Sequence, residues 1–286
     1  MSAAAKDFPR RNRLDLMSPA ELAITTAMGA VEEAGADVRL TEAVNLLGQA
    51  RDKVADVVNG IPFIPTVPGT PFAGGFYAGR IAHDGQTYAL IVAPKAEGEH
   101  SGIVWKTDWR AATPGTQSLI DGFANTEAMN DDGHPAAQWA RSLRVAGLDD
   151  WYLPARDELE VIYRNLKPTP DDNWTYPSRL ARYGAKPGQY NGVDEHGNGH
   201  NASSVPPGAS YIETSPSQTT AEAFQEGGPE AFERAWYWSS TEFYPATAWL
   251  QYFVDGVQVD GGKYGVLQAR AVRKVLLSTS PIPLSV

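Results

Sequence analysis

The segment DDWYLPARDEL, residues 149–159, predicts a short strand that leads directly into a helix. Trp151 and Leu153 alternate with polar neighbours, as expected of a half-buried strand, and Pro154 ends the strand because it has no N–H to donate. The helix, predicted over residues 155–166, has one apolar face at helical spacing. That face consists of Leu159, Ile162, Tyr163 and Leu166. We therefore expect the rest of the domain to pack around this segment.

Two carboxylates lie in the first turn of the predicted helix. The exposed amides and the positive end of the helix dipole favour Asp157 and Glu158 there, so the pair has an explanation that does not require catalysis. Residue 155, where a Ser or Thr cap is expected, is an alanine. An alanine lacks the side-chain acceptor that typically contributes ~1 kcal/mol to the stability of a helix start.

Four segments follow the order of a known family pattern: WYLPARDEL at 151–159, YWSSTE at 237–242, an aromatic strand with a glycine turn at 249–256, and RAVR at 270–273. On these segments the chain resembles the DUF1566 family, also called the Lcl C-terminal family, of bacterial and phage proteins. That family has the C-type-lectin-like fold. The resemblance implies an α+β domain over residues 72–275, in which two helices pack on antiparallel sheets.

Further strand and helix signals fit such a domain. The Asp-Gly pair at 84–85 predicts a type I′ hairpin turn, and residues 87–93 read as the buried strand that follows it. Residues 103–105 predict another short strand, and residues 134–145 predict the first helix. A last strand is expected at 267–275.

Residues 167–235 interrupt this pattern and form a large insertion in the domain. The insertion is rich in Pro, Gly, Asn and Ser, but it also contains aromatic residues, which disordered segments have in low numbers. We therefore predict ordered, irregular loops on the domain surface, with a short helix within residues 219–232.

Aromatic side chains are the main recognition signal, because Tyr and Trp offer a large contact area and a polar tip at a small cost in side-chain entropy. Trp151, Trp236, Trp238 and Trp249 are expected in the core. The rings of the insertion have no strand or helix periodicity to bury them, so we expect them to be partly exposed. The predicted ligand-binding residues are Trp174, Tyr176, Tyr190, Tyr211 and Tyr244. If the insertion is instead a packed layer, the alternative location for the site is the strands of residues 244–264.

The first 71 residues have a different organisation. Residues 1–16 predict an extended arm, residues 17–60 predict two helices with apolar seams, and residues 61–71 predict a stiff linker with four prolines. The helices either pair within one chain or bundle around a symmetry axis. We favour a homo-oligomer, such as a trimer, because a two-helix hairpin of mostly Ala and Val buries little surface. Residues 276–286 are expected to form a tail.

Composition narrows the class of protein. The 286-residue chain has a formal net charge of −10 and a pI near 5.0, which argues against nucleic-acid binding. There is no cysteine, so disulfides, thiolate zinc sites and cysteine nucleophiles are excluded. No apolar run of about 18 residues and no signal peptide is evident, so we expect no membrane insertion and synthesis in the host cytoplasm.

Two polar segments contain residue types that could carry chemistry. Residues 194–201, DEHGNGHN, could wrap a cation, but the same residue types form any exposed turn. We predict no metal and no cofactor, and leave metal binding by this loop open. Residues 239–241, SST, lack a nucleophile elbow, which predicts that the chain is not an enzyme. Arg270 and Arg273 are expected to be buried partners of Asp157, Glu158 or Glu242.

Together these observations predict a binding protein: a helical oligomerisation or docking segment, a stiff linker and a lectin-like domain that presents loops. The resemblance implies a phage tail receptor-binding protein, located in the virion tail, whose partners are other tail proteins and a host-cell receptor such as a polysaccharide or a pilus. A structural tail-fibre or tail-tip component without receptor contact is the alternative.

Overall fold

A computed structural model describes residues 64–175 and 199–277 and shows a mixed α+β fold with two sheets and few helices. The described residues from Pro65 onward belong to one compact unit. The predicted arm and helices of residues 1–60, the first three residues of the predicted linker and residues 278–286 of the predicted tail lie outside the described residues. The rest of the linker, residues 64–71, is described: the Gly69 N–H donates to the Tyr77 carbonyl at 2.8 Å, and Pro71 pairs with Phe76. Residues 276–277, predicted as the start of the tail, lie at the end of the last strand.

The first sheet has the strand order β1-β2-β3-β9, and every neighbouring pair is antiparallel. Its strands are β1 (Pro71–Phe72), β2 (Gly75–His83), β3 (Gln86–Val92) and β9 (Val272–Leu277). Asp84 and Gly85 join β2 to β3 with φ angles of 49° and 72°. Positive φ at both central residues defines a type I′ turn, so the predicted hairpin is confirmed.

The second sheet has the order β4-β8-β5-β6-β7. Its strands are β4 (Glu99–Val104), β5 (Trp236–Tyr244), β6 (Thr247–Tyr252), β7 (Gln258–Gly262) and β8 (Val266–Arg270). β5 and β8 run parallel and the other pairs are antiparallel. The expectation of purely antiparallel sheets is therefore wrong at this one junction.

The last predicted strand, residues 267–275, is divided between the two sheets. Ala271 separates β8 from β9, and its N–H donates to the carbonyl of Gly98 while its own carbonyl accepts from Ala93. The backbone at Ala271 thus leaves one sheet's hydrogen-bond ladder before entering the other. An apolar run of sequence has no signal for such a crossing.

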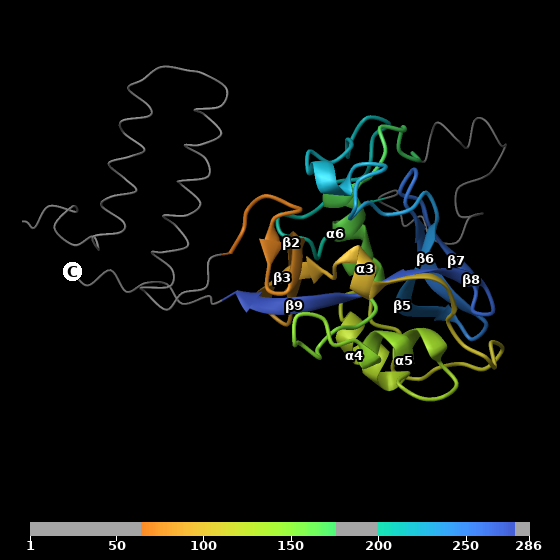
Figure 1. Cartoon of the computed structure of the whole chain (residues 1–286). Helices are drawn as coiled ribbons and strands as arrows, with labels where there is room; N and C mark the ends of the chain where they lie inside the picture. Colours follow the sequence, from red (N-terminus) through yellow and green to blue (C-terminus); the bar gives the residue numbers. More distant parts are fainter. Residues whose placement is uncertain (1–63, 176–198, 278–286) are drawn as a thin grey trace, which may run out of the picture. The chain divides into compact units, whose positions relative to one another are not determined.

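Within residues 64–175 and 199–277 the helices are short, apart from α6 (Arg156–Leu166), which confirms the predicted helix. The others are α3 (Lys95–Gly98), α4 (Gly122–Ala128), α5 (Pro135–Ser142) and the 3-10 helix η2 (Glu222–Phe224). The helix predicted over residues 134–145 is shorter than expected, α4 was not predicted, and η2 lies where a short helix was expected in the insertion. α6 contacts β2 of the first sheet and β5 and β6 of the second, and Figure 1 shows it between them.

The segment before α6 is extended but is not a full strand. Its only ladder contact is the bridge between Tyr152 and Val272, whose N–H groups each donate to the other's carbonyl at 2.9 Å. Other backbone groups of the segment bond to side chains: Arg141 donates to the Trp151 carbonyl, and the Leu153 N–H donates to Thr126. Side chains therefore replace the neighbouring strand that the sequence pattern predicted.

Glu158 takes over part of the missing cap at the start of α6. Its Oε2 accepts from the Ala155 N–H at 2.8 Å, which is the backward half of a capping box. The carboxylate is fully buried, and Tyr152 donates to its Oε1 at 3.1 Å. The structural interpretation of this carboxylate therefore holds, with a specific role at the helix start.

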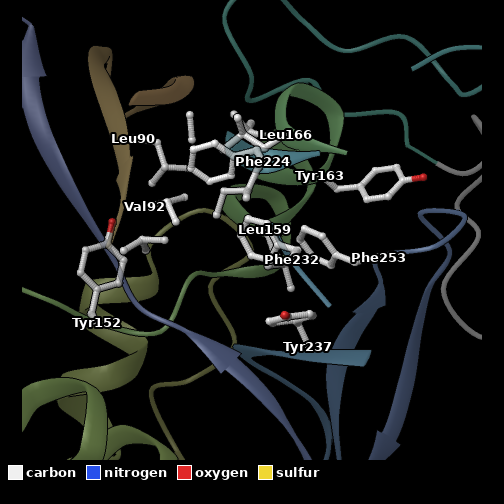
Figure 2. Close-up of a cluster of buried hydrophobic side chains, with 14 of the residues drawn as sticks. Leu90, Val92, Tyr152, Leu159, Tyr163, Leu166, Phe224, Phe232, Tyr237 and Phe253 are labelled. Atoms are coloured by element: carbon white, nitrogen blue, oxygen red, sulfur yellow. The ribbon is translucent and has the colours of Figure 1, made fainter. Parts of the chain in front are cut away.

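Two clusters of buried side chains form the core. The larger cluster lies around α6 and is rich in aromatic rings. Figure 2 labels ten residues of this cluster. The smaller one includes Trp105 and Trp238 and lies between α5 and the second sheet. Trp151 and Trp238 are fully buried and Trp249 is nearly so, as expected, whereas Trp236 is half-buried and stacks on Tyr252.

Candidate functional site

Exposed aromatic rings gather at two turns of the second sheet. Tyr244, at the end of β5, is 55% exposed, and Tyr264, between β7 and β8, is 61% exposed. Phe243 contacts Tyr244 with ring centroids 4.3 Å apart, and Trp109 contacts Tyr264 at 4.9 Å. We call these four residues the aromatic face.

Hydrogen bonds join the two turns that carry these rings. The Lys263 N–H donates to the carbonyl of Ala246 at 3.1 Å, and Lys263 Nζ donates to that of Pro245 at 2.9 Å. Lys263 directly precedes Tyr264, and Pro245 directly follows Tyr244. The two exposed tyrosines are therefore fixed on neighbouring backbone.

A buried ion pair lies beneath the aromatic face. The Lys263 side chain is fully buried, its Nζ lies 2.5 Å from Glu242 Oε2, and it lies 4.6 Å from the ring centroid of Trp105. Burial lowers the pKa of Lys263, although the hydrogen bond to Glu242 acts in the opposite direction. Glu242 also accepts from the Thr113 N–H at 2.6 Å and from Gln117 at 3.1 Å. These bonds tie the loop before α4 to β5.

A second polar chain fixes the loop that carries Trp109. Lys106 Nζ donates to the carbonyls of Ala111 and Ala112 and to the hydroxyl of Thr113, at 2.9 to 3.0 Å. That hydroxyl lies 3.1 Å from His134 Nε2, and His134 Nδ1 lies 2.7 Å from Asp131. The bond from His134 lowers the pKa of the Asp131 carboxyl. The loop is thus held on both sides of Trp109, the residue whose ring contacts Tyr264.

Tyr211 does not lie on a recognition surface, and its predicted exposure is wrong. The side chain is 5% exposed, its ring lies 5.7 Å from that of Tyr163, and its hydroxyl donates to Glu160 at 2.9 Å. Burial and the neighbouring Glu160 charge raise the pKa of Tyr211, and burial raises that of Glu160. The insertion packs this ring against α6 because a buried carboxylate there requires donors.

The other predicted residues have mixed positions. Tyr244 is exposed, as expected of a contact residue. Trp174 is half-buried, and its backbone N–H donates to the carbonyl of Asp255. Tyr176 and Tyr190 lie outside the described residues. The structure therefore brings Tyr244 together with Tyr264 and Trp109, not with Tyr211.

Sequence reasoning did not select Trp109 or name Tyr264 as a site residue. Tyr264 is the last residue of the segment 244–264, the alternative location predicted for the site. A usable signal is the glycine on each side of Lys263-Tyr264, because Gly262 and Gly265 favour a turn that presents the residues between them. The Gly265 N–H donates to the Gly262 carbonyl at 2.8 Å. Trp109 lies in a loop that no pattern connects with residue 264.

Arg270 and Arg273 are partners of carboxylates other than those predicted. The buried Arg270 guanidinium bonds to Glu99 at 3.0 Å and Glu230 at 2.8 Å, and the Arg273 guanidinium makes two bonds of 2.7 Å to Asp150. The cations beside Asp157, Glu158 and Glu242 are instead Arg156, Lys274 and Lys263. The sequence does not reveal which carboxylates pair with Arg270 and Arg273. The chain crosses between the sheets at Ala271, so Arg270 lies in β8 and Arg273 in β9, and their neighbours differ.

No group of His, Asp or Glu side chains in residues 64–175 and 199–277 has the arrangement of a metal site. Most of the loop at 194–201 lies outside those ranges. Its described end is structural: Asn201 Nδ2 donates to the Asp157 carbonyl at 2.9 Å and to Glu160 at 2.7 Å. In the part of the chain that was described, no helix is long and apolar enough to cross a membrane.

Comparisons with known proteins find no matching family model, no matching curated protein and no matching solved structure.

Proposed function

We propose that the chain is a phage tail receptor-binding protein whose aromatic face contacts a receptor on the host cell. The observation that supports this most is the exposure of Tyr244 and Tyr264 on turns held by a fully buried ion pair. Aromatic side chains with little freedom to reorder give binding energy at a small entropic cost, and they dominate many interfaces. The face therefore has the two properties that recognition requires, contact area and rigidity.

We further propose that residues 72–275 form a C-type-lectin-like domain of the DUF1566 family. The family pattern supports this because its segments have defined structural roles in this chain. Residues 151–159 supply the core tryptophan and the start of α6, residues 237–242 lie in β5, and residues 270–273 connect the two sheets. The setting in a virion tail, the homo-oligomeric state and the contacts with other tail proteins belong to the same proposal.

The alternative is a structural tail-fibre or tail-tip component, in which the aromatic face contacts another virion protein. The two functions differ in what the intact protein binds. Fluorescently labelled full-length protein should be mixed with a panel of bacterial strains, and separately with disrupted virions that lack it. Binding to some strains and not to others supports receptor recognition. Binding to virion proteins without binding to any strain would assign the structural function instead.

A further inference from the structure

A small pocket lined by both charged and aromatic side chains lies on the first sheet and shares no residue with the aromatic face. Its volume is about 300 Å³, at the small end of the range for small-molecule sites. It is lined by Tyr88, Asp121, Phe123, Asp150, Tyr152 and Lys274, with His83 at one side. These residues come from β2, β3, β9, the start of α4 and the segment before α6, so distant parts of the sequence meet here. We call it the Lys274 pocket.

Lys274 carries an ammonium group with one N–H donor more than it has acceptors among the described residues. Its side chain is 10% exposed, and its Nζ lies 3.2 Å from Asp121 Oδ1 and 3.3 Å from Glu158 Oε1. Burial lowers the pKa of Lys274, but the charges of Glu158 and Asp121 outweigh burial and raise it, so the group stays charged. An ammonium has three N–H donors, and the described residues supply acceptors for two of them.

The acidic side of the pocket has acceptors to spare. Asp121 Oδ1 accepts from Lys274 and from the Ala124 N–H, whereas its Oδ2 has only His83 Nε2 nearby, at 3.8 Å, which is too long for a hydrogen bond. Asp150 is held by Arg273 and is still 41% exposed. A ligand group with hydroxyl donors therefore has free carboxylate lone pairs to bind.

Aromatic rings form the apolar side. Phe123 is 38% exposed, and its ring meets that of Tyr152 edge to face at 5.8 Å and 90°. Figure 2 shows Tyr152 set apart from the other labelled rings of the core cluster, in keeping with its place in the pocket lining. Lys274 Nζ lies 5.5 Å from the ring centroid of Tyr88 and 5.8 Å from that of Tyr152. Polar donors and acceptors thus lie next to apolar ring surface.

We propose that the Lys274 pocket binds a neutral sugar ring. A pyranose has hydroxyls that both donate and accept, and it has an apolar face of C–H groups that packs on aromatic rings. Lys274 supplies a donor, Asp121 and Asp150 supply acceptors, and Phe123 supplies the ring surface. An acidic sugar fits less well, because two carboxylates, those of Asp121 and Asp150, line the pocket against the one ammonium group of Lys274. The inference does not depend on the receptor-binding proposal.

The test is saturation-transfer NMR on the full-length protein with millimolar methyl glucoside, methyl galactoside and methyl N-acetylglucosaminide, with glucuronic acid as the charged probe. At least one neutral sugar should show saturation transfer and bind at least about tenfold tighter than glucuronic acid. Phe123→Ala should weaken its binding by about tenfold, the size expected for loss of a ring contact. Ile212→Ala is the matched control and should leave this binding unchanged, because Ile212 is a 61% exposed apolar side chain outside both the pocket lining and the aromatic face.

His83→Ala is the second pocket variant and decides the result if Phe123→Ala lowers the melting temperature. Weaker sugar binding in His83→Ala, with Ile212→Ala unchanged, supports the pocket. Three results would overturn it: no saturation transfer to any neutral sugar, equal binding of glucuronic acid, or full binding in both pocket variants. Loss of sugar binding in Tyr244→Ala alone would place the sugar on the aromatic face, and so reject the pocket while supporting the proposed function.

Discussion

Two buried lysines, one beneath the aromatic face and one in the Lys274 pocket, have opposite pKa shifts. Lys263 has one carboxylate partner, Glu242, and burial lowers its pKa. Lys274 has two, Glu158 and Asp121, and their charges raise its pKa in spite of burial. Both lie against aromatic rings and burial lowers both pKa values. The second carboxylate beside Lys274, and the charge of Lys106 that also lowers the pKa of Lys263, therefore account for the difference.

The difference separates a structural charge from a charge that faces a cavity. Lys263 donates to two acceptors, Glu242 and the carbonyl of Pro245, and its side chain is fully buried. Lys274 also has two acceptors, Asp121 and Glu158, but it lies in the lining of a cavity, where a ligand can reach its third donor. A buried lysine is therefore informative about function only when its access to a cavity is known.

The largest loss of stability is expected from Glu242→Ala, which removes the carboxylate partner of Lys263. The substitution leaves Lys263 buried without its carboxylate, and breaking a buried pair in this way typically costs about 3–5 kcal/mol. Urea unfolding of the two proteins measures the loss. The double variant Glu242→Gln with Lys263→Met removes both charges and should recover part of the stability. A loss below about 1 kcal/mol for Glu242→Ala would show that water reaches Lys263 and that the support is not rigid.

A smaller loss is expected from Lys274→Met, about 1–3 kcal/mol at neutral pH, because Glu158 then lacks its cation. Burial already raises the pKa of Glu158, so the folded variant gains stability as pH falls through that raised pKa and the carboxyl becomes neutral. The deficit relative to the parent should therefore shrink toward pH 4.5, the ordinary pKa of the carboxyl. Thermal melts at several pH values measure it. A deficit that stays constant with pH would mean that lost packing, not charge, causes it.

The next largest loss of stability is expected from a change at Asp121, whose pKa is lowered in the folded protein. Burial acts to raise this pKa, but Lys274 and the Ala124 N–H outweigh it. A lowered folded-state pKa gives stability that is present above the ordinary value of 3.8 and is lost as pH falls through the folded value. Asp121→Asn keeps a capping side chain for α4, so it removes the charge alone. We expect a deficit of about 1 kcal/mol at pH 7 that disappears below pH 3.8. A deficit that persists there would contradict the charge interaction.

The regular elements of the fold were accessible from sequence, because local chemistry determines them. The Asp84-Gly85 turn requires positive φ, which glycine adopts freely, and α6 has a continuous apolar face. The segment at 149–153 has the alternation of a strand, but it gains its hydrogen bonds from side chains such as Arg141 and Thr126. Long-range partners of this kind leave no periodic signal.

The candidate site was accessible only in part, for the same reason. Tyr244 ends β5 and precedes Pro245, which indicates an exposed turn. Tyr211 lies among loop formers and gave a similar signal, yet Glu160 of α6 draws its hydroxyl into the core. Whether an aromatic residue in a loop is exposed depends on a polar partner far away in sequence, which periodicity cannot identify.

The smallest effect on stability and the largest on binding are expected from Tyr244→Ala combined with Tyr264→Ala. Each side chain is more than half exposed, so the double variant should lose no more than about 1 kcal/mol of unfolding free energy, about 0.5 for each surface substitution. Leu276→Ala is the matched control, because Leu276 is a 50% exposed apolar side chain on β9, in the other sheet.

The most direct test of receptor recognition is the affinity of these full-length variants for a bacterial strain that binds the parent protein, measured by flow cytometry. We expect the tyrosine double variant to bind at least about a hundredfold more weakly than the parent, as for two aromatic hot spots, at an unchanged melting temperature. Leu276→Ala should bind like the parent. Parental affinity in the double variant would contradict the account and remove the aromatic face as the recognition surface.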